Sequence, residues 1–185
     1  MASEWRKRLV AMSDLMTLHD KLKEKGKKIV FTAGSWDLLH VGQCRYLEQA
    51  KSEGDILVVG VSSNAAIRSV KGPNKPILDE KIRAEMLTYL RSVDFVTILP
   101  EASCAPTLGL LKPEVFITVK EDWAAAYKES KEYRTVTSYG GTVRVVDRQS
   151  TALSTTKIVQ RAIGGQLGDI FKDFMELRKD PLRER

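Results

Sequence analysis

The residues best suited to chemistry lie in one stretch near the start of the chain. An apolar, β-branched run at residues 29–32 predicts a buried strand, and the small residues 33–35 predict a turn. A helix is expected to begin between His40 and Gly42, because apolar and small residues recur at helical spacing after it. Backbone N–H groups at a helix start attract anions, and a glycine lets a phosphate approach the backbone closely. The stretch therefore predicts a cradle for the phosphates of a nucleotide.

Two polar side chains of this cradle are suited to hold phosphate oxygens. His40 and Gln43 lie three positions apart, so they fall on the same side of the first helical turn. Both side chains can donate hydrogen bonds, but only the histidine can carry a positive charge or move a proton.

Two motifs in the chain resemble those of the nucleotidyltransferase superfamily, which includes cytidylyltransferases and adenylyltransferases. GSWDLLHVGQ at residues 34–43 resembles the H-x-G-H signature, and LSTTKI at residues 153–158 resembles the S-T-T-x-[IV] motif. Further segments resemble most closely the adenylyltransferase domain of ADP-heptose synthase, to which glycerol-3-phosphate cytidylyltransferase is related. They are GKKIVFTAG at 26–34, DILVVGVSSNAAIRSVKGPNKPI at 55–77 and RAEML at 83–87. The resemblance covers residues 13–163.

The chain departs from the superfamily pattern in three segments. Gln43 stands where the signature has its second histidine, and residues 33–37 replace the usual N-G-C-F-D. Residues 119–123 replace the glycine-bearing segment after the fourth strand. These departures support an alternative to an active enzyme, namely a catalytically weakened relative that binds nucleotide in a regulatory or scaffolding role.

The resemblance implies transfer of AMP or CMP from ATP or CTP to a small phosphorylated acceptor, with release of pyrophosphate. The acceptor phosphate attacks the α-phosphorus in line, so donors and cations must align two anions. The implied catalytic residues are His40 and Gln43 as donors and Lys71 as the cation between acceptor phosphate and α-phosphate. A solvated loop lysine is the alternative for Lys71. Mg²⁺ is expected to arrive with the triphosphate, held by phosphate oxygens and water, so no metal-binding residues are predicted.

The resemblance favours ATP and a sugar 1-phosphate, such as heptose 1-phosphate, as substrates. CTP with glycerol phosphate or ethanolamine phosphate is the second expectation. The resemblance also implies a set of nucleotide-binding residues. They are Ala33, Gly34, Ser35, Trp36, Asp37, Gly42, Arg83, Asp122, Trp123, Arg148, Ser154, Thr155 and Thr156. Structural roles are the alternatives for Trp36 as a core residue, for Arg83 in a salt bridge, and for Ser154 as a helix cap.

The rest of the chain predicts the elements that position this site. Strands are predicted at 55–62, 94–99, 115–119 and 142–146, and helices at 64–70, 79–91 and 107–111. The helix at 79–91 is expected to turn Ile82, Met86, Leu87 and Leu90 inward. This alternation is typical of an α/β, Rossmann-like, doubly wound parallel sheet of about five strands with helices on both faces. Ligands bind such sheets beyond the C-terminal ends of the strands, where the cradle is expected.

Helices are also predicted at both ends of the chain. Residues 5–25 carry an apolar stripe, and a helix from Ser154 to about residue 162 precedes an apolar, then charged, tail at 164–185. The expected domain spans 1–163. We expect the tail either to fold back onto this domain or to contribute to a homodimer, which the resemblance favours.

Composition limits the class of protein. A chain of 185 residues suits one domain, and 43% hydrophobic with 29% charged residues is ordinary for a soluble globular protein. The net charge of +6 is scattered, which disfavours a dedicated nucleic-acid binder. No apolar run is long enough for a membrane span, and no signal-peptide core is found. Cys44 and Cys104 are too few for a disulfide framework or a zinc site, so a cytoplasmic setting is expected.

Overall fold

The computed structural model describes residues 4–120, 127–147, 149 and 154–177. The chain divides into two compact units, residues 1–150 and residues 151–185, and each is described by itself.

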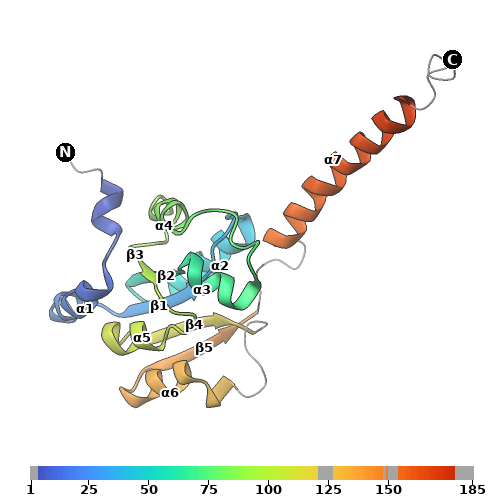
Figure 1. The fold of residues 1–185 in the computed structure, drawn as a ribbon. Coiled ribbons are helices and arrows are strands. Elements are labelled where there is room, and N and C mark those ends of the chain that lie inside the picture. The colour runs from blue at the N-terminus through green and yellow to red at the C-terminus, as the bar shows by residue number, and fades with distance from the viewer. Residues whose placement is uncertain (1–3, 121–126, 148, 150–153, 178–185) are drawn as a thin grey trace, which may run out of the picture. The chain divides into compact units, whose positions relative to one another are not determined.

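The first unit is built on a five-stranded sheet with the order β3-β2-β1-β4-β5, and every pair of neighbouring strands is parallel (Figure 1). The strands are β1 (Ile29–Gly34), β2 (Ile56–Ser62), β3 (Phe95–Leu99), β4 (Val115–Val119) and β5 (Thr142–Val146). The order of the strands reverses between β1 and β4. In doubly wound sheets this reversal opens a crevice at the C-terminal strand ends.

Helices cover both faces of the sheet (Figure 1). They are α1 (Leu15–Glu24), α2 (Val41–Ser52), α3 (Asn64–Lys71), α4 (Glu80–Thr88), α5 (Ala105–Leu111) and α6 (Lys131–Ser138). Val30 and Phe31 are adjacent in β1 but belong to different cores, because successive side chains of a strand point to opposite faces. Val30 shares its core with Leu47 of α2, and Phe31 shares the other with Leu108 of α5. The predicted fold class is therefore confirmed.

The predicted helix over residues 5–25 is wrong in its first half. Only α1 is α-helical there, and short 3₁₀ turns at Glu4–Arg8 and Met12–Asp14 precede it. Between these turns the chain runs beside β3, where the Val10 N–H donates to the Val96 carbonyl at 2.9 Å. Backbone pairing with the edge of the sheet thus replaces the helical hydrogen bonds that the apolar stripe predicts.

The predicted inward face of α4 is partly wrong. Ile82 is 50% exposed and Met86 is 36% exposed, whereas Leu87 is buried as expected. Arg83 and Ala84 are fully buried in their place. The helix is rotated because the Arg83 guanidinium has buried acceptors to satisfy, which hydrophobic spacing alone does not reveal.

The second unit contains one long helix, α7 (Thr155–Leu177), where the sequence predicts a helix to about residue 162 and a separate helical tail at 164–185. Gly164 lies inside this helix, and apolar residues continue past it at helical spacing. Ile163, Leu167 and Ile170 are 50%, 59% and 63% exposed along it. Among the described residues, no helix combines the length and apolar character needed to cross a membrane. A domain boundary at residue 163 stays a prediction.

Candidate active site

The predicted start of α2 is confirmed, with His40 as its N-cap residue and Gly42 buried in its first turn. The Gln43 side chain folds back to this start. Its Oε1 accepts a hydrogen bond from the His40 backbone N–H at 3.1 Å, which completes a capping box. Gln43 therefore fixes the backbone of His40, while its amide nitrogen keeps two donors. A contact of either side chain with nucleotide stays a prediction.

The loop between β1 and α2, residues 35–40, holds two non-glycine residues in the left-handed region. They are Trp36, with φ of 53°, and Leu38, with φ of 47°. Each costs on the order of 1 kcal/mol, so the surrounding structure must hold them in place. Trp36 is 6% exposed, its indole N–H donates to the Gly60 carbonyl at 2.9 Å, and its ring stacks on Tyr46. A Cβ at Gly34 would lie only 3.0 Å from the Trp36 ring, so this close approach requires glycine. The structure thus assigns Trp36 to the core, the alternative role that the sequence left open.

Asp37 ties this loop to the segment that follows α3. Its buried carboxylate accepts hydrogen bonds from the backbone N–H groups of Ile77 at 2.8 Å and Leu78 at 3.0 Å. The Asp37 carboxylate therefore orients the backbone of Ile77, which is 40 positions away in the sequence.

Arg83 of α4 also supports the loop at residues 35–40. Its side chain has no exposed surface, and it donates hydrogen bonds to the carbonyls of Ser35 and Leu78 and, at 2.9 Å, to Asn64 Oδ1. Burial lowers the pKa of the guanidinium, and the carboxylate of Asp37 opposes that shift. Arg83 thus positions the loop through Ser35, a role that sequence reasoning did not assign. Direct contact between Arg83 and nucleotide stays a prediction.

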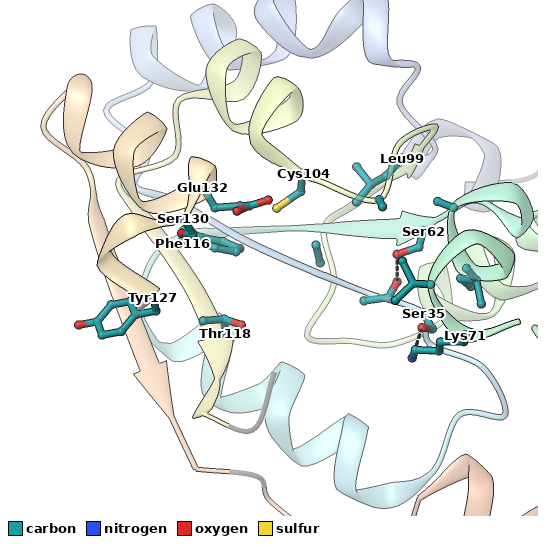
Figure 2. A pocket seen from close by; sticks show the side chains of 16 residues that line it. Ser35, Ser62, Lys71, Leu99, Cys104, Phe116, Thr118, Tyr127, Ser130 and Glu132 are labelled. Atoms are coloured by element: carbon teal, nitrogen blue, oxygen red, sulfur yellow. Dashed lines mark hydrogen bonds between the residues drawn. The ribbon is translucent and has the colours of Figure 1, made fainter. Parts of the chain in front are cut away.

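Lys71 reaches the same loop from the last turn of α3. Its exposed ammonium donates to Ser35 Oγ at 2.9 Å, across 36 positions of sequence (Figure 2). The ammonium thus lies beside the turn that the sequence predicts as the phosphate cradle.

A pocket of about 530 Å³ opens beside Ser35 and Lys71, at the C-terminal ends of β1, β2 and β4. Ser62, at the end of β2, and Thr118, near the end of β4, line it, and so do Tyr127, Ser130 and Glu132 around the start of α6 (Figure 2). The pocket lies at the reversal of strand order, where doubly wound sheets bind ligands. Ala33 and Gly34 also line it, whereas His40, Gly42 and Gln43 of the predicted cradle are not among the residues that line it, so the cradle stays a prediction.

Sequence reasoning missed most of the pocket wall. Ser62 and Thr118 carry a signal that could have been used, since each is a polar residue closing an apolar strand. Glu132 carries none, because α6 is largely polar and was not predicted as a helix.

Several predicted residues are not brought to this pocket. Asp122, Trp123 and Arg148 lie outside the described residues. Ser154, Thr155 and Thr156 belong to the second unit. There the Lys157 N–H donates to Ser154 Oγ at 3.2 Å, so Ser154 caps α7. Their contact with phosphate stays a prediction. Within the described parts of the chain, no group of three or more His, Cys, Asp or Glu side chains could hold a metal ion.

Comparison with known proteins identifies the family of this chain. A family model described as cytidylyltransferase-like matches residues 31–161, which span the cradle and every strand of the sheet. The chain belongs to the cytidylyltransferase-like family. Membership confirms the resemblance drawn from the motifs and places the chain among the nucleotidyltransferases.

Curated relatives of this cytidylyltransferase-like chain include the bifunctional proteins HldE of two bacteria. The chain is 43% identical to HldE of Geobacter metallireducens over 145 residues, which is 77% of this chain and 29% of HldE. It is 34% identical to HldE of Syntrophotalea carbinolica over 162 residues, which is 88% of this chain and 32% of HldE. The chain thus spans about a third of the length of these relatives.

Solved structures agree on the fold. A lipopolysaccharide core biosynthesis protein from Thermoplasma volcanium is 30% identical, with a TM-score of 0.56 over 66% of this chain and 97% of that chain. The pantoate-β-alanine ligase from Francisella tularensis is 16% identical, with a TM-score of 0.52 over 81% of this chain and 74% of that chain. The ligase therefore supports the fold alone.

Proposed function

We propose that this protein transfers AMP from ATP to a small phosphorylated acceptor and releases pyrophosphate. The observation that carries the proposal is the Lys71–Ser35 contact of 2.9 Å at the edge between the cradle and the pocket. An ammonium at this edge can neutralise an anion on either side, and two phosphate-bearing substrates would otherwise repel each other there.

The proposed reaction needs no covalent enzyme intermediate. An oxygen of the acceptor phosphate attacks the α-phosphorus, the bond from α-phosphorus to the bridging oxygen breaks, and pyrophosphate leaves. His40 and the N-terminal N–H groups of α2 would hold the triphosphate, and Lys71 would move from Ser35 Oγ to the two reacting phosphates. The triphosphate is taken as its magnesium complex, with the ion held by phosphate oxygens and water.

A sugar 1-phosphate such as heptose 1-phosphate is the proposed acceptor. The identity to HldE proteins and to a lipopolysaccharide core biosynthesis protein supports this choice over other phosphate esters. Transfer of CMP to glycerol phosphate or ethanolamine phosphate is the second choice, supported by the cytidylyltransferase-like family match.

One observation favours a different function, nucleotide binding without efficient transfer. Gln43 replaces a charged or proton-moving side chain, and its oxygen is engaged by the His40 N–H at 3.1 Å. A relative weakened in this way would bind nucleotide in a regulatory or scaffolding role.

Pyrophosphate release tests the two functions against each other. ATP and CTP, each with magnesium, are paired with a panel of sugar 1-phosphates and alcohol phosphates, and Lys71→Ala serves as the control for contaminating activity. Turnover with one pair, abolished in the variant, supports transfer and identifies both substrates. Thermal stabilisation by nucleotide without turnover on any acceptor supports the binding function instead. If neither thermal stabilisation nor turnover is observed, both functions are excluded.

We also propose that the chain acts as a homodimer in the cytoplasm. The exposed stripe of Ile163, Leu167 and Ile170 on α7 supports pairing, because apolar stripes on helices favour partners. Light scattering of the full chain and of Leu167→Glu tests this, and a monomeric wild-type chain would contradict it.

A further inference from the structure

The two ends of the pocket carry opposite charges. Ser35 and Lys71 form one end, and Ser130 and Glu132 lie at the other (Figure 2). Among the described residues that line the pocket, Lys71 and Glu132 are the charged ones. A ligand that spans the pocket therefore meets a cation at one end and a carboxylate at the other.

Glu132 is held in place by its surroundings. It lies in the first turn of α6, where a negative charge is favoured, and Ser103 Oγ donates to its Oε1 at 2.7 Å. The carboxylate is half-buried, and the neighbouring Cys104 is buried. Burial first, and then the charge of Glu132, raises the pKa of the Cys104 thiol to about 12. The wall beside the carboxylate is thus neutral, and Glu132 supplies the charge of this end.

The groups near Glu132 include hydroxyls as well as the Cys104 thiol and the Phe116 ring. Ser130 Oγ accepts a hydrogen bond from the Tyr133 N–H at 3.1 Å, which leaves its own O–H to donate. The side chains of Thr118 and Tyr127 line the same part of the pocket (Figure 2). A carboxylate accepts up to about four hydrogen bonds, and Ser103 supplies one of them. Hydroxyls that donate and accept, next to a carboxylate that only accepts, match the hydroxyl groups of a polyol.

We infer that Glu132 is a specificity-determining residue that binds the hydroxyl groups of the acceptor, so that the acceptor class is a polyhydroxylated phosphate ester. The inference rests on the proposed function for the placement of the acceptor phosphate beside Lys71. A pocket of about 530 Å³ has room for a sugar phosphate. An ammonium-bearing acceptor is the competing class, but the hydroxyls of Ser130 and Thr118 favour a ligand that also donates and accepts hydrogen bonds.

The test compares wild-type protein with Glu132→Gln and with the matched control Glu129→Gln, an exposed glutamate nearby that does not line the pocket. Each is assayed with a sugar 1-phosphate, with ethanolamine phosphate and with propyl phosphate. Glu132→Gln is expected to raise the KM for the sugar 1-phosphate about tenfold, because hydrogen bonds to a charged group are lost. The KM for nucleotide, the KM for propyl phosphate and the melting temperature are expected to stay unchanged.

Several outcomes would overturn the inference. One is an unchanged KM for the sugar 1-phosphate in Glu132→Gln. Another is an equal rise for propyl phosphate, which would indicate a general structural effect. A wild-type preference for ethanolamine phosphate that Glu132→Gln abolishes would assign the carboxylate to an ammonium.

Calorimetric titration of the sugar 1-phosphate without nucleotide separates this inference from the proposed function. Wild-type binding that weakens about tenfold in Glu132→Gln, together with no pyrophosphate release in the separate assay with nucleotide, would support the Glu132 assignment and contradict nucleotidyl transfer. Turnover that Glu132→Gln leaves unchanged would support nucleotidyl transfer and contradict the Glu132 assignment. The absence of both binding and turnover would overturn both claims.

Discussion

The loop at residues 35–40, of which Ser35 lines the pocket, and the far end of the pocket differ in how they are supported. The loop contains two left-handed residues and is held by the Gly60 carbonyl of β2 and by the side chains of Tyr46 in α2 and Arg83 in α4. The far end rests on the first turn of α6, where Ser103 donates one hydrogen bond to Glu132. In the proposed function the loop would face phosphates, which both substrates carry, so its geometry would have to be fixed in advance. The far end would face the part of the acceptor that varies, and a few side chains on a helix suffice to select it.

Replacing Arg83 with methionine is the strongest way to break this contrast. The carbonyls of Ser35 and Leu78 and the amide of Asn64 would each lose a buried donor. We expect the free energy of unfolding to fall by about 3 to 5 kcal/mol, measured by urea denaturation. Arg83→Lys keeps the charge but not the planar fork, so an intermediate loss is expected. A loss below about 1 kcal/mol for Arg83→Met would show that the loop supports itself.

Lys71→Ala tests the junction between the two regions. The side chain is exposed and makes one hydrogen bond, so the melting temperature should hardly change. We expect kcat to fall on the order of 100- to 1,000-fold, as when a donor to transition-state charge is removed. Lys75→Ala, in the segment that follows α3 and outside the pocket, is the matched control. Equal losses in both variants would contradict a special role for Lys71.

Trp36→Phe tests how much of the stability of the strained loop depends on a single hydrogen bond. The ring keeps its place beside Tyr46, but the Gly60 carbonyl loses its donor. We expect a loss of about 1 to 2 kcal/mol in stability and a raised KM for nucleotide with an unchanged KM for acceptor. A change confined to the acceptor would contradict the division of the site into two regions.

Gln43→His sharpens the contrast with a small expected change in stability. The variant loses the Oε1 that accepts the His40 N–H, which should cost roughly 0.5 to 1 kcal/mol by thermal denaturation. If the glutamine limits catalysis, kcat should rise in the same variant, because imidazole can carry charge. A fall in kcat would show that the capping hydrogen bond matters more than the charge at this position.

Sequence reasoning succeeded where one segment determines its own structure. The apolar, β-branched runs predict all five strands, and the helical spacing of apolar and small residues after Gly42 predicts the start of α2. Sequence reasoning failed where the position of a residue depends on contacts with its partners elsewhere in the chain. Arg83 is buried because carbonyls from separate loops meet around it, and Gln43 folds back because His40 presents a backbone N–H. The pocket wall at Glu132 could not be predicted, because the polar pattern of α6 contains no sign of the strands it lies beside.

The contact between Arg83 and Ser35 joins residues 48 positions apart, and this has a consequence for the order in which the site forms during synthesis. Ser35 and its neighbours in the loop are synthesised roughly 2 to 10 s before Arg83, at ordinary rates of elongation. Trp36 likewise has no acceptor for its indole until β2 has emerged and paired with β1. A growing chain shorter than about 83 residues therefore carries the signature without Arg83, and the proposed nucleotide site can form only after α4 has docked.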